Sequence, residues 1–426
     1  MKVQITAPRF GGSLRVPSSK SMTHRELIAA ALAPGQSRVS GVSPSEDIRA
    51  TVSILTLLGA GFEMKKNPDG TETILVRGGL APQGKAVSAD AGESGSTLRF
   101  LIPIGLVSGN EVTYTGHGKL PSRPLTPYLD LFKEKQISCR TEGGLPLTVA
   151  GMLRGGDYAL PGNVSSQFFT GLLFALPLAE GDSVLRSTTP LESEGYVDMT
   201  VDTLTRHGIA IGTPEKGVFA IPGGQTYRAG DFSVEGDYSQ AAFWLAAALT
   251  GGKMTLEGLS PSSRQGDREI VEILRKMGGS IRRDGDTVTA EKSATRGTVI
   301  DAENVPDLVP VLAALAAVSE GTTEIIRAAR VRLKECDRLH AMTAELKKLG
   351  ADIEERADGL IIRGKESLSG GTVDSWNDHR IAMALAAVSA KCTGSLVIEG
   401  AEAVRKSYPR FWEDFQAAAP GSLTGI

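Results

Sequence analysis

The sequence has little cysteine and histidine and no strong charge of either sign. Its three cysteines, Cys139, Cys336 and Cys392, lie far apart and form no Cys-x-x-Cys pair or Cys/His cluster, which disfavours a structural zinc site or a disulfide framework. The formal net charge is −3 and no strongly basic stretch occurs, so nucleic acid is not an expected partner. This cysteine usage fits a reducing cytoplasm, where we expect the protein to reside.

Long apolar segments are also missing. The run from Leu172 to Leu178 is among the longest, and it is far shorter than the roughly 20 residues that a membrane-spanning helix needs. The N-terminal residues MKVQITAP lack the apolar core and the small-residue cleavage site of a signal peptide. We therefore expect no association with a membrane.

What the sequence does contain is an internal repeat. Six segments open on Ser, Asp, Asn or Gly, the residue types that cap helix N-termini, and continue as Ala/Leu-rich stretches that are apolar nearly all round. The starts recur about every 70 residues, and such a period indicates a repeated architecture. The segments begin at Val16, Asp90, Leu160, Val234, Val305 and Trp376.

Each Ala/Leu-rich segment is followed by a short strand, a second and amphipathic helix, and a pair of strands. In GADIEERADGLIIRG, for example, Asp358 and Gly359 are typical of a hairpin turn. The pattern predicts an α/β fold of two similar domains, each with three repeated helix–strand–helix–hairpin units.

Six units are too many for one hydrophobic core. We expect the break just before the fourth copy and expect the first strand and turn to complete the C-terminal group. The predicted domains are residues 1–18 with 235–426, and residues 19–234, with a hinge near 17–20 and 232–237. The fourth helix start, residues 236–240, has no cation, which suits a place at the hinge.

Lys and Arg gather at the starts of the repeated helices. A helix N-terminus offers unpaired N–H groups and the positive end of the helix dipole, and both favour an anion. Lys20 stands at the start of the first helix, and Ser21 and Arg25 are spaced to share one face. Each such position alone is more often an ordinary cap or a solvated charge. Helix starts in the other copies, and a few loops beside them, carry further cations and hydrogen-bonding residues, together with one glycine: Gly95, Ser96, Thr97, Arg99, Arg123, Ser165, Ser166, Gln167, Lys334, Arg338, Arg380 and Lys406.

Two acids accompany these cations. Asp307 begins the fifth helix, and Glu335 lies between Lys334 and Arg338. A carboxylate among cations can act as a general acid or base, although Asp307 could equally be a simple helix cap. The motifs GxSxG and HExxH are absent, which disfavours a serine hydrolase or a zinc protease.

Taken in order, the short motifs resemble one enzyme family along essentially the whole chain. They are PSSKSMTHR, the GST-LR helix start, SRP, NVSSQF, VPD, RLKECDR, NDHR and KSYP. The combination resembles the 3-phosphoshikimate 1-carboxyvinyltransferases, or EPSP synthases. The resemblance implies two domains of three repeats each, of the inverted α/β barrel type, around a central cleft.

The resemblance also implies a reaction. The 5-hydroxyl of shikimate 3-phosphate adds to C2 of phosphoenolpyruvate while C3 is protonated, and loss of phosphate and of a C3 proton then gives 5-enolpyruvylshikimate 3-phosphate. The implied partners are these two small anions. No metal or organic cofactor is implied, and we expect a monomer.

Residue roles follow from the matching motifs. For shikimate 3-phosphate the resemblance implies Lys20, Ser21, Arg25, Ser165, Ser166, Gln167, Ser193, Asp307 and Lys334. For phosphoenolpyruvate it implies Lys20, Gly95, Arg123, Gln167, Arg338, Arg380 and Lys406. The implied catalytic residues are Asp307 as the proton acceptor near the 5-hydroxyl, Glu335 as the acid at C3, and Lys20.

The sequence departs from the family pattern at several positions. Glu93 brings a carboxylate toward an anion pocket, Ser96 replaces Thr, His24 replaces Asn, and Arg330 stands where many members have a neutral residue. Two other functions fit these motifs less well. The sister enzyme acting on UDP-N-acetylglucosamine usually has a Cys before its Arg-Pro pair, which GHGKLPSRP lacks, and a non-catalytic anion-binding repeat protein could have lost Asp307 and Glu335.

Overall fold

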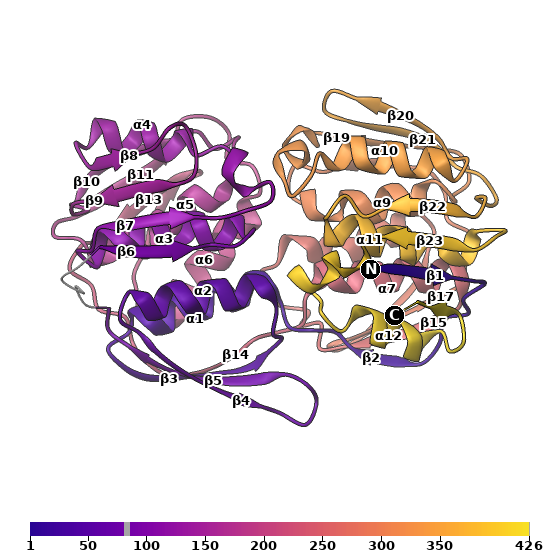
Figure 1. Ribbon diagram of the computed structural model, residues 1–426, viewed down its shortest axis with the longest axis horizontal. Helices are drawn as coiled ribbons and strands as arrows, with labels where there is room; N and C mark the ends of the chain where they lie inside the picture. The colour runs from indigo at the N-terminus through magenta and orange to yellow at the C-terminus, as the bar shows by residue number, and fades with distance from the viewer. Residues whose placement is uncertain (81–85, 426) are drawn as a thin grey trace. The chain divides into compact units, whose positions relative to one another are not determined.

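Six four-stranded sheets, each with its own helices, make up the part of the chain that the structure describes (Figure 1). The structure is a computed structural model that describes residues 1–80 and 86–425. The predicted α/β class with six repeated units is confirmed. No helix within these residues is long and apolar enough to cross a membrane.

Contacts along the chain divide it into two compact units. Unit 1 comprises Met1–Ser19 and Glu235–Ile426, and unit 2 comprises Lys20–Val234. Each unit contains three of the sheets and has its own hydrophobic core.

Unit 2 contains the first three copies of the repeat. Its helices are α1 (Lys20–Leu32), α2 (Glu46–Leu57), α3 (Gly95–Val107), α4 (Thr126–Glu134), α5 (Ser166–Ala175) and α6 (Glu194–Arg206), with short 3-10 helices η1 (Leu120–Ser122) and η2 (Leu176–Leu178). Its strands are β3 (Gly35–Val42), β4 (Gly61–Lys66), β5 (Glu72–Gly78), β6 (Val87–Asp90), β7 (Val112–Thr115), β8 (Ser138–Arg140), β9 (Leu147–Ala150), β10 (Gly156–Leu160), β11 (Ser183–Ser187), β12 (Gly212–Glu215), β13 (Val218–Ile221) and β14 (Asp231–Ser233).

Unit 1 contains the last three copies and the N-terminal strands. Its helices are α7 (Tyr238–Gly251), α8 (Ile270–Lys276), α9 (Val309–Ala316), α10 (Arg338–Lys348), α11 (His379–Ala387) and α12 (Phe411–Ala418), with 3-10 helices η3 (Gly266–Glu269), η4 (Pro306–Leu308), η5 (Ala329–Leu333), η6 (Ser389–Lys391) and η7 (Ala401–Lys406). Its strands are β1 (Lys2–Ile5), β2 (Ser13–Arg15), β15 (Lys253–Glu257), β16 (Ser280–Asp284), β17 (Thr287–Glu291), β18 (Val299–Asp301), β19 (Thr322–Ile326), β20 (Asp352–Arg356), β21 (Gly359–Arg363), β22 (Gly371–Asp374), β23 (Leu396–Glu399) and β24 (Leu423–Thr424).

Each repeat has one strand more than the predicted unit. In the third copy β10 leads into α5 and pairs in parallel with β11, and the antiparallel strands β13 and β12 extend the sheet. A parallel pair needs a crossover connection, and the buried helix provides it. The leading strands are only three to five residues long, for example β14 and β10, so alternation of polar and apolar residues marks them weakly.

Two leading strands are exchanged along the chain. β2 precedes α1 in sequence but pairs with β15 of unit 1, whereas β14 precedes α7 but pairs with β3 of unit 2. β1 also joins unit 1, where it lies between β23 and β24. In unit 1 the segment after β2 and the segment after β14 are joined by two hydrogen bonds, from Ser19 N to Glu235 O (2.8 Å) and from Asp237 N to Pro17 O (2.9 Å).

The first helix of each repeat is buried almost all round, because its side chains are mainly small or apolar. Every residue of α7 from Tyr238 to Thr250 is buried, and so is every residue of α1 from Met22 to Leu32. Polar side chains cap the starts of several of these helices. The caps are Ser94 on α3, Ser165 on α5, Asp237 on α7 and Asp378 on α11.

The hairpin between β20 and β21 corrects one expectation. Arg356 pairs with Gly359, so Ala357 and Asp358 form the turn and Gly359 is the first residue of β21. A Cβ atom on Gly359 would overlap the backbone carbonyl oxygen of Ile325 in β19. Glycine is required here by close approach of the neighbouring strand rather than by turn geometry.

We predict that Gly359→Ala lowers the free energy of unfolding by about 1–3 kcal/mol, because the β19 backbone must shift. Gly11→Ala is the matched control, since a Cβ at Gly11 meets nothing within 4 Å. Urea unfolding of both variants measures the difference. Equal stability of the two variants would contradict the steric explanation.

Candidate active site

Lys20 is the first residue of α1 in unit 2. Its Nζ lies 2.6 Å from Oδ2 of Asp47, which is in the first turn of α2. Both side chains are largely buried, with 15% and 10% exposed. The pair fixes the ammonium group at the start of two neighbouring helices.

Arg25, one turn after Ser21, is buried and connects α1 to α6 within unit 2. Its Nε donates to Thr200 Oγ1 (2.9 Å), and its Nη2 donates to Tyr196 O (2.7 Å). Its Nη1 donates to Ser21 O at 2.7 Å. Burial lowers the pKa of Arg25 to about 10, and the group remains a cation at neutral pH.

His24 links the first helix start to the second. Its Nδ1 lies 2.8 Å from Thr51 Oγ1, which lies 2.7 Å from Thr97 Oγ1, and Thr97 Oγ1 donates to Ser94 Oγ at 2.8 Å. Burial, with smaller contributions from Lys20 and Arg25, lowers the pKa of His24 well below its ordinary value. The imidazole is therefore neutral and acts as part of a hydrogen-bond chain.

Gly95 leaves space for a guanidinium group. A Cβ on Gly95 would lie 2.7 Å from Nη1 of Arg123, so the Arg123 head lies directly over this glycine. The Arg123 Nε is buried and has no hydrogen-bond partner within the described residues. Glu93, whose carboxylate was expected to face an anion pocket, lies against Gly118 of the following loop.

The start of α5 joins the second and third copies. Ser165 caps the helix and accepts from Gln167 N. The Gln167 side chain accepts from Arg99 Nη1 (2.7 Å) and donates to Ser96 Oγ (2.9 Å).

Ser193 precedes α6 with a left-handed backbone, at φ 56° and ψ 44°, and is buried. This conformation is uncommon for a residue with a side chain and is maintained only where the surroundings require it. Unit 2 thus places the predicted residues at the starts of α1, α3, α5 and α6, except Arg123, which follows η1.

In unit 1, Asp307 is surrounded by three cations. Its Oδ1 lies 3.2 Å from Lys334 Nζ and 2.9 Å from Arg338 Nη1. Its Oδ2 lies 3.0 Å from Arg380 Nη2. Asp307 lies inside η4, whose N-cap residue is Val305, and the N-cap residue of α9 is Leu308, so the simple cap interpretation does not describe Asp307.

Arg338 is the most deeply buried cation of this cluster, with 1% of its side chain exposed. Its Nε pairs with Asp378 Oδ2 and its Nη2 with Glu335 Oε2, each at 2.8 Å. Burial acts to lower the pKa of Arg338, but Asp378, Glu335 and Asp307 outweigh it and raise the pKa well above its ordinary value.

Lys406 is buried at the end of η7, and its Nζ donates to Asn377 O at 2.6 Å. Asn377 directly precedes Asp378, the cap of α11, so Lys406 is held beside the Arg380 segment. Arg330 donates instead to the backbone oxygen of Glu303. The Cys336 thiol donates to Asp378 Oδ2 at 3.6 Å, and burial raises its pKa.

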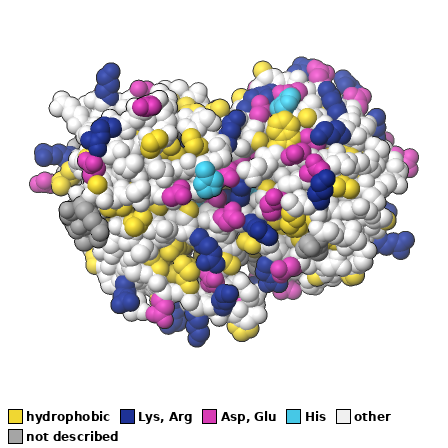
Figure 2. Space-filling model, viewed as in Figure 1, with side chains coloured by type: hydrophobic (Ala, Val, Ile, Leu, Met, Phe, Trp, Pro, Cys, Tyr) yellow, Lys and Arg dark blue, Asp and Glu magenta, His cyan; other side chains and the backbone are white. Residues whose placement is uncertain are grey.

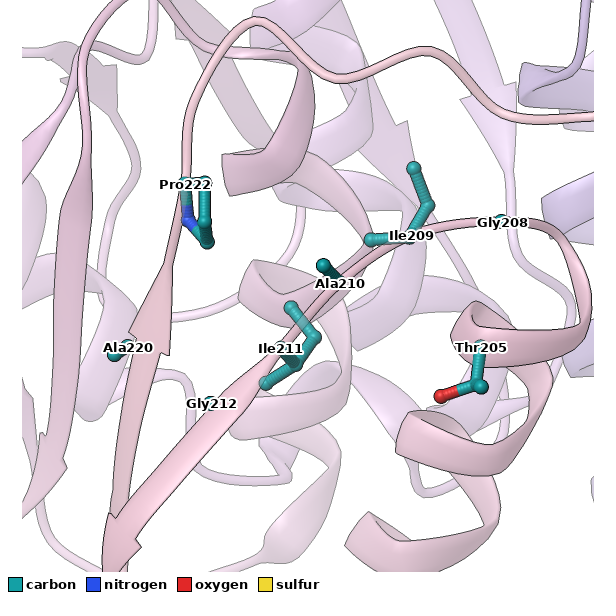
Figure 3. Close-up of a pocket in the computed structure, with 8 residues that line it drawn as sticks. All are labelled: Thr205, Gly208, Ile209, Ala210, Ile211, Gly212, Ala220 and Pro222. Carbon is teal, nitrogen blue, oxygen red and sulfur yellow. The ribbon is translucent and has the colours of Figure 1, made fainter.

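Two surface grooves of unit 2 contain none of the predicted site residues. The groove in Figure 3 has only Thr205 as a polar side chain, and the second has mixed charges along β3, β4, β5 and β14. The face drawn in Figure 2 shows Lys and Arg interspersed with Asp and Glu. Within the described residues, no group of three or more His, Cys, Asp or Glu is placed to hold a metal ion.

Comparison with known proteins identifies the family. The model of the EPSP synthase (3-phosphoshikimate 1-carboxyvinyltransferase) family matches residues 5–415. The chain belongs to the EPSP synthase family. A 3-phosphoshikimate 1-carboxyvinyltransferase of Clostridium kluyveri is 52% identical over 416 residues, covering 97% of this chain and 96% of the relative. One from Clostridium novyi is 48% identical over 419 residues, with the same coverage.

A solved EPSP synthase structure from Acinetobacter baumannii has the same fold. It aligns with a TM-score of 0.82 at 27% identity and covers 99% of both chains. The resemblance inferred from the sequence motifs is confirmed.

For this EPSP synthase family member, sequence reasoning missed several supporting residues. Asp378 appeared only as part of a helix start, yet it pairs with Arg338 and caps α11. Asp47, the partner of Lys20, was not recognised either. An acid at a helix cap two residues before Arg380 was the available signal for Asp378, whereas nothing in the sequence joins Asp47 to Lys20.

We predict that Asp378→Ala destabilises the protein by about 3–5 kcal/mol, because Arg338 would lose a buried counter-charge. Asp352→Ala is the control, since its pair with Arg363 at 3.2 Å leaves half of each side chain exposed. Loss of this exposed ion pair should lower the free energy of unfolding by less than about 1 kcal/mol. Unfolding monitored by circular dichroism measures the free energy of unfolding of both variants. If Asp378→Ala loses no more stability than Asp352→Ala, the prediction is wrong.

Proposed function

We propose that this chain transfers the enolpyruvyl group of phosphoenolpyruvate to the 5-hydroxyl of shikimate 3-phosphate, releasing phosphate. The observation that carries this proposal is the match to the EPSP synthase family over residues 5–415. The buried cations at the helix starts support it, because both substrates are anions and charge-assisted contacts favour them there.

Unit 2 supplies most of the proposed contacts to shikimate 3-phosphate. Lys20, Ser21 and Arg25 lie on the first turns of α1, where the helix dipole also favours a phosphate. Three of the Arg25 nitrogens already bond within unit 2, so this residue also fixes the site's shape. The further proposed contacts are Ser165, Ser166, Gln167 and Ser193.

The phosphoenolpyruvate contacts are proposed to come from both units. Unit 2 offers Lys20, Gln167 and Arg123, whose guanidinium group lies over Gly95. Unit 1 offers Arg338, Arg380 and Lys406. A guanidinium group can bind a carboxylate or phosphate through two hydrogen bonds, which suits both charged ends of this substrate.

Asp307 is proposed to accept the proton of the 5-hydroxyl as its oxygen attacks C2. Its ion pairs with Lys334, Arg338 and Arg380 favour the ionised form, which a base requires. Glu335 is proposed to protonate C3, and Lys20 to balance the charge on the substrate. Phosphate then leaves as C3 returns a proton to the Glu335 carboxylate, which restores the double bond.

We further propose that units 1 and 2 act as two domains that move as substrates bind, because the proposed substrate contacts come from both. A hinge near 17–20 and 232–237 would allow this movement. We also propose a monomer. The free cysteines Cys139, Cys336 and Cys392 support a cytoplasmic location.

The reaction is tested by steady-state release of phosphate from phosphoenolpyruvate. We expect release with shikimate 3-phosphate and none with UDP-N-acetylglucosamine. Release only with the sugar nucleotide would favour the sister enzyme, and binding of shikimate 3-phosphate without release would favour a non-catalytic protein.

We predict that Asp307→Asn lowers kcat by about 10²–10⁴-fold, as expected for the loss of a general base. Asp301→Asn is the matched control, because Asp301 pairs with Arg327 on the surface. Circular dichroism verifies folding of both variants. An unchanged kcat in a folded Asp307→Asn variant would remove Asp307 from the mechanism.

A further inference from the structure

Asp267 is a buried acid of unit 1 to which the proposed mechanism gives no role. It lies in η3, and only 2% of the residue is exposed. Its Oδ2 accepts a hydrogen bond from Ser239 Oγ on the first turn of α7. Its Oδ1 is buried and has no hydrogen-bond partner within the described residues.

The segment that carries Asp267 is fixed to the start of α7. The Gln265 side chain accepts from Tyr238 N at 3.1 Å and donates to Gly236 O at 2.8 Å. Asp267 is thereby held at the fourth helix start, the one without a cation. Its position is set by hydrogen bonds, and no ion pair to it occurs in the described part of the chain.

The η3 segment lies against the residues that lead into η4 and Asp307, because a Cβ on Gly266 would lie 2.9 Å from Asn304 O. Burial is the largest influence and raises its pKa, the negative charges of Asp307 and Asp237 raise it further, and Arg380 and the Ser239 hydroxyl lower it, leaving the pKa at about 7. On its own element, Arg268 and Glu269 are exposed.

Asp267 and Asp307 thus differ in what stabilises a negative charge. Asp307 has Lys334, Arg338 and Arg380 within 3.2 Å. Asp267 has one hydroxyl and an unpartnered oxygen. When two acids influence each other, the one with cationic partners ionises first and the other retains its proton.

We propose that Asp267 is a positioning residue that stays protonated beside Asp307 and so keeps Arg380 available for phosphoenolpyruvate. The proposal rests on the function proposed above. The proton of the 5-hydroxyl goes to Asp307, and the proton of Asp267 stays in place. An ionised Asp267 would compete for Arg380 and would repel an anionic substrate.

Stability tests the protonation of Asp267 without any need for activity. A pKa raised from 3.8 to about 7 means that the folded state binds this proton more tightly than the unfolded state. Stability from this group is therefore full below about pH 4 and is lost as the pH rises to about 7. Asp267→Asn mimics the protonated acid and removes the effect.

We predict that the unfolding equilibrium constant of the wild type, relative to Asp267→Asn, rises by up to about tenfold per pH unit between pH 5 and pH 7. Glu269→Gln, an exposed acid of the same 3-10 helix, should follow the wild type. A wild-type to Asp267→Asn ratio that does not change with pH would overturn the proposal.

The second readout is the pH dependence of KM for phosphoenolpyruvate. Above pH 7 this KM should rise several-fold more in the wild type than in Asp267→Asn, because only the wild type acquires the extra negative charge. Titration of the substrate affects both proteins equally, so it does not contribute to the difference between their KM values. Superimposable profiles for these two proteins would overturn the role toward Arg380.

Ser239→Ala provides an independent variant if Asp267→Asn folds poorly. Losing the hydroxyl donor raises the pKa of Asp267, so the rise in KM should move to higher pH, and an unmoved profile would count against the proposal. If no variant releases phosphate, the proposed function fails, whereas the stability measurement still decides the protonation of Asp267.

Discussion

The guanidinium group of Arg338 is buried, and a buried charge must be paired. Three acids meet this requirement: Asp307, Glu335 and Asp378. They come from η4, from the loop before α10 and from the start of α11, so one cation aligns three segments that are far apart in sequence. Asp307 in turn orients Lys334 and Arg380. The geometry of the unit 1 site follows because each of these buried charges would lower the stability of the fold if it were left unpaired.

Unit 2 holds its buried cations in two ways. Lys20 pairs with the Asp47 carboxylate, whereas Arg25 donates to hydroxyl and carbonyl oxygens of Thr200, Tyr196 and Ser21. These neutral acceptors satisfy the N–H groups of Arg25 without neutralising its positive charge. The starts of the unit 2 helices therefore favour anions, whereas unit 1 combines cations with the acids that proton transfer requires. This difference agrees with the proposed proton-transfer roles of Asp307 and Glu335, which both belong to unit 1.

The repeat explains why polar residues gather where they do. α1 and α7 are buried along nearly their whole lengths, so their starts are the places where polar groups can act without opening the core. The exchange of β2 and β14 makes each unit depend on a strand from a distant part of the chain. Close packing of strands also restricts the residue type at single positions. Gly359, for example, must be a glycine because the β19 backbone lies directly against it.

The sequence by itself determined the repeat, the α/β class and the family, because these depend on local patterns and on ordered motifs along one chain. Alternation could not reveal the short leading strands, whose partners follow only after a crossover helix. Nor could it show that Asp378 supports Arg338, that Asp47 pairs with Lys20, or that Glu93 lies against Gly118. Only the tertiary structure decided these contacts and the different surroundings of Asp267 and Asp307. Ion pairing and burial depend on which side chains meet in space, and that is set by the packing of whole helices and sheets.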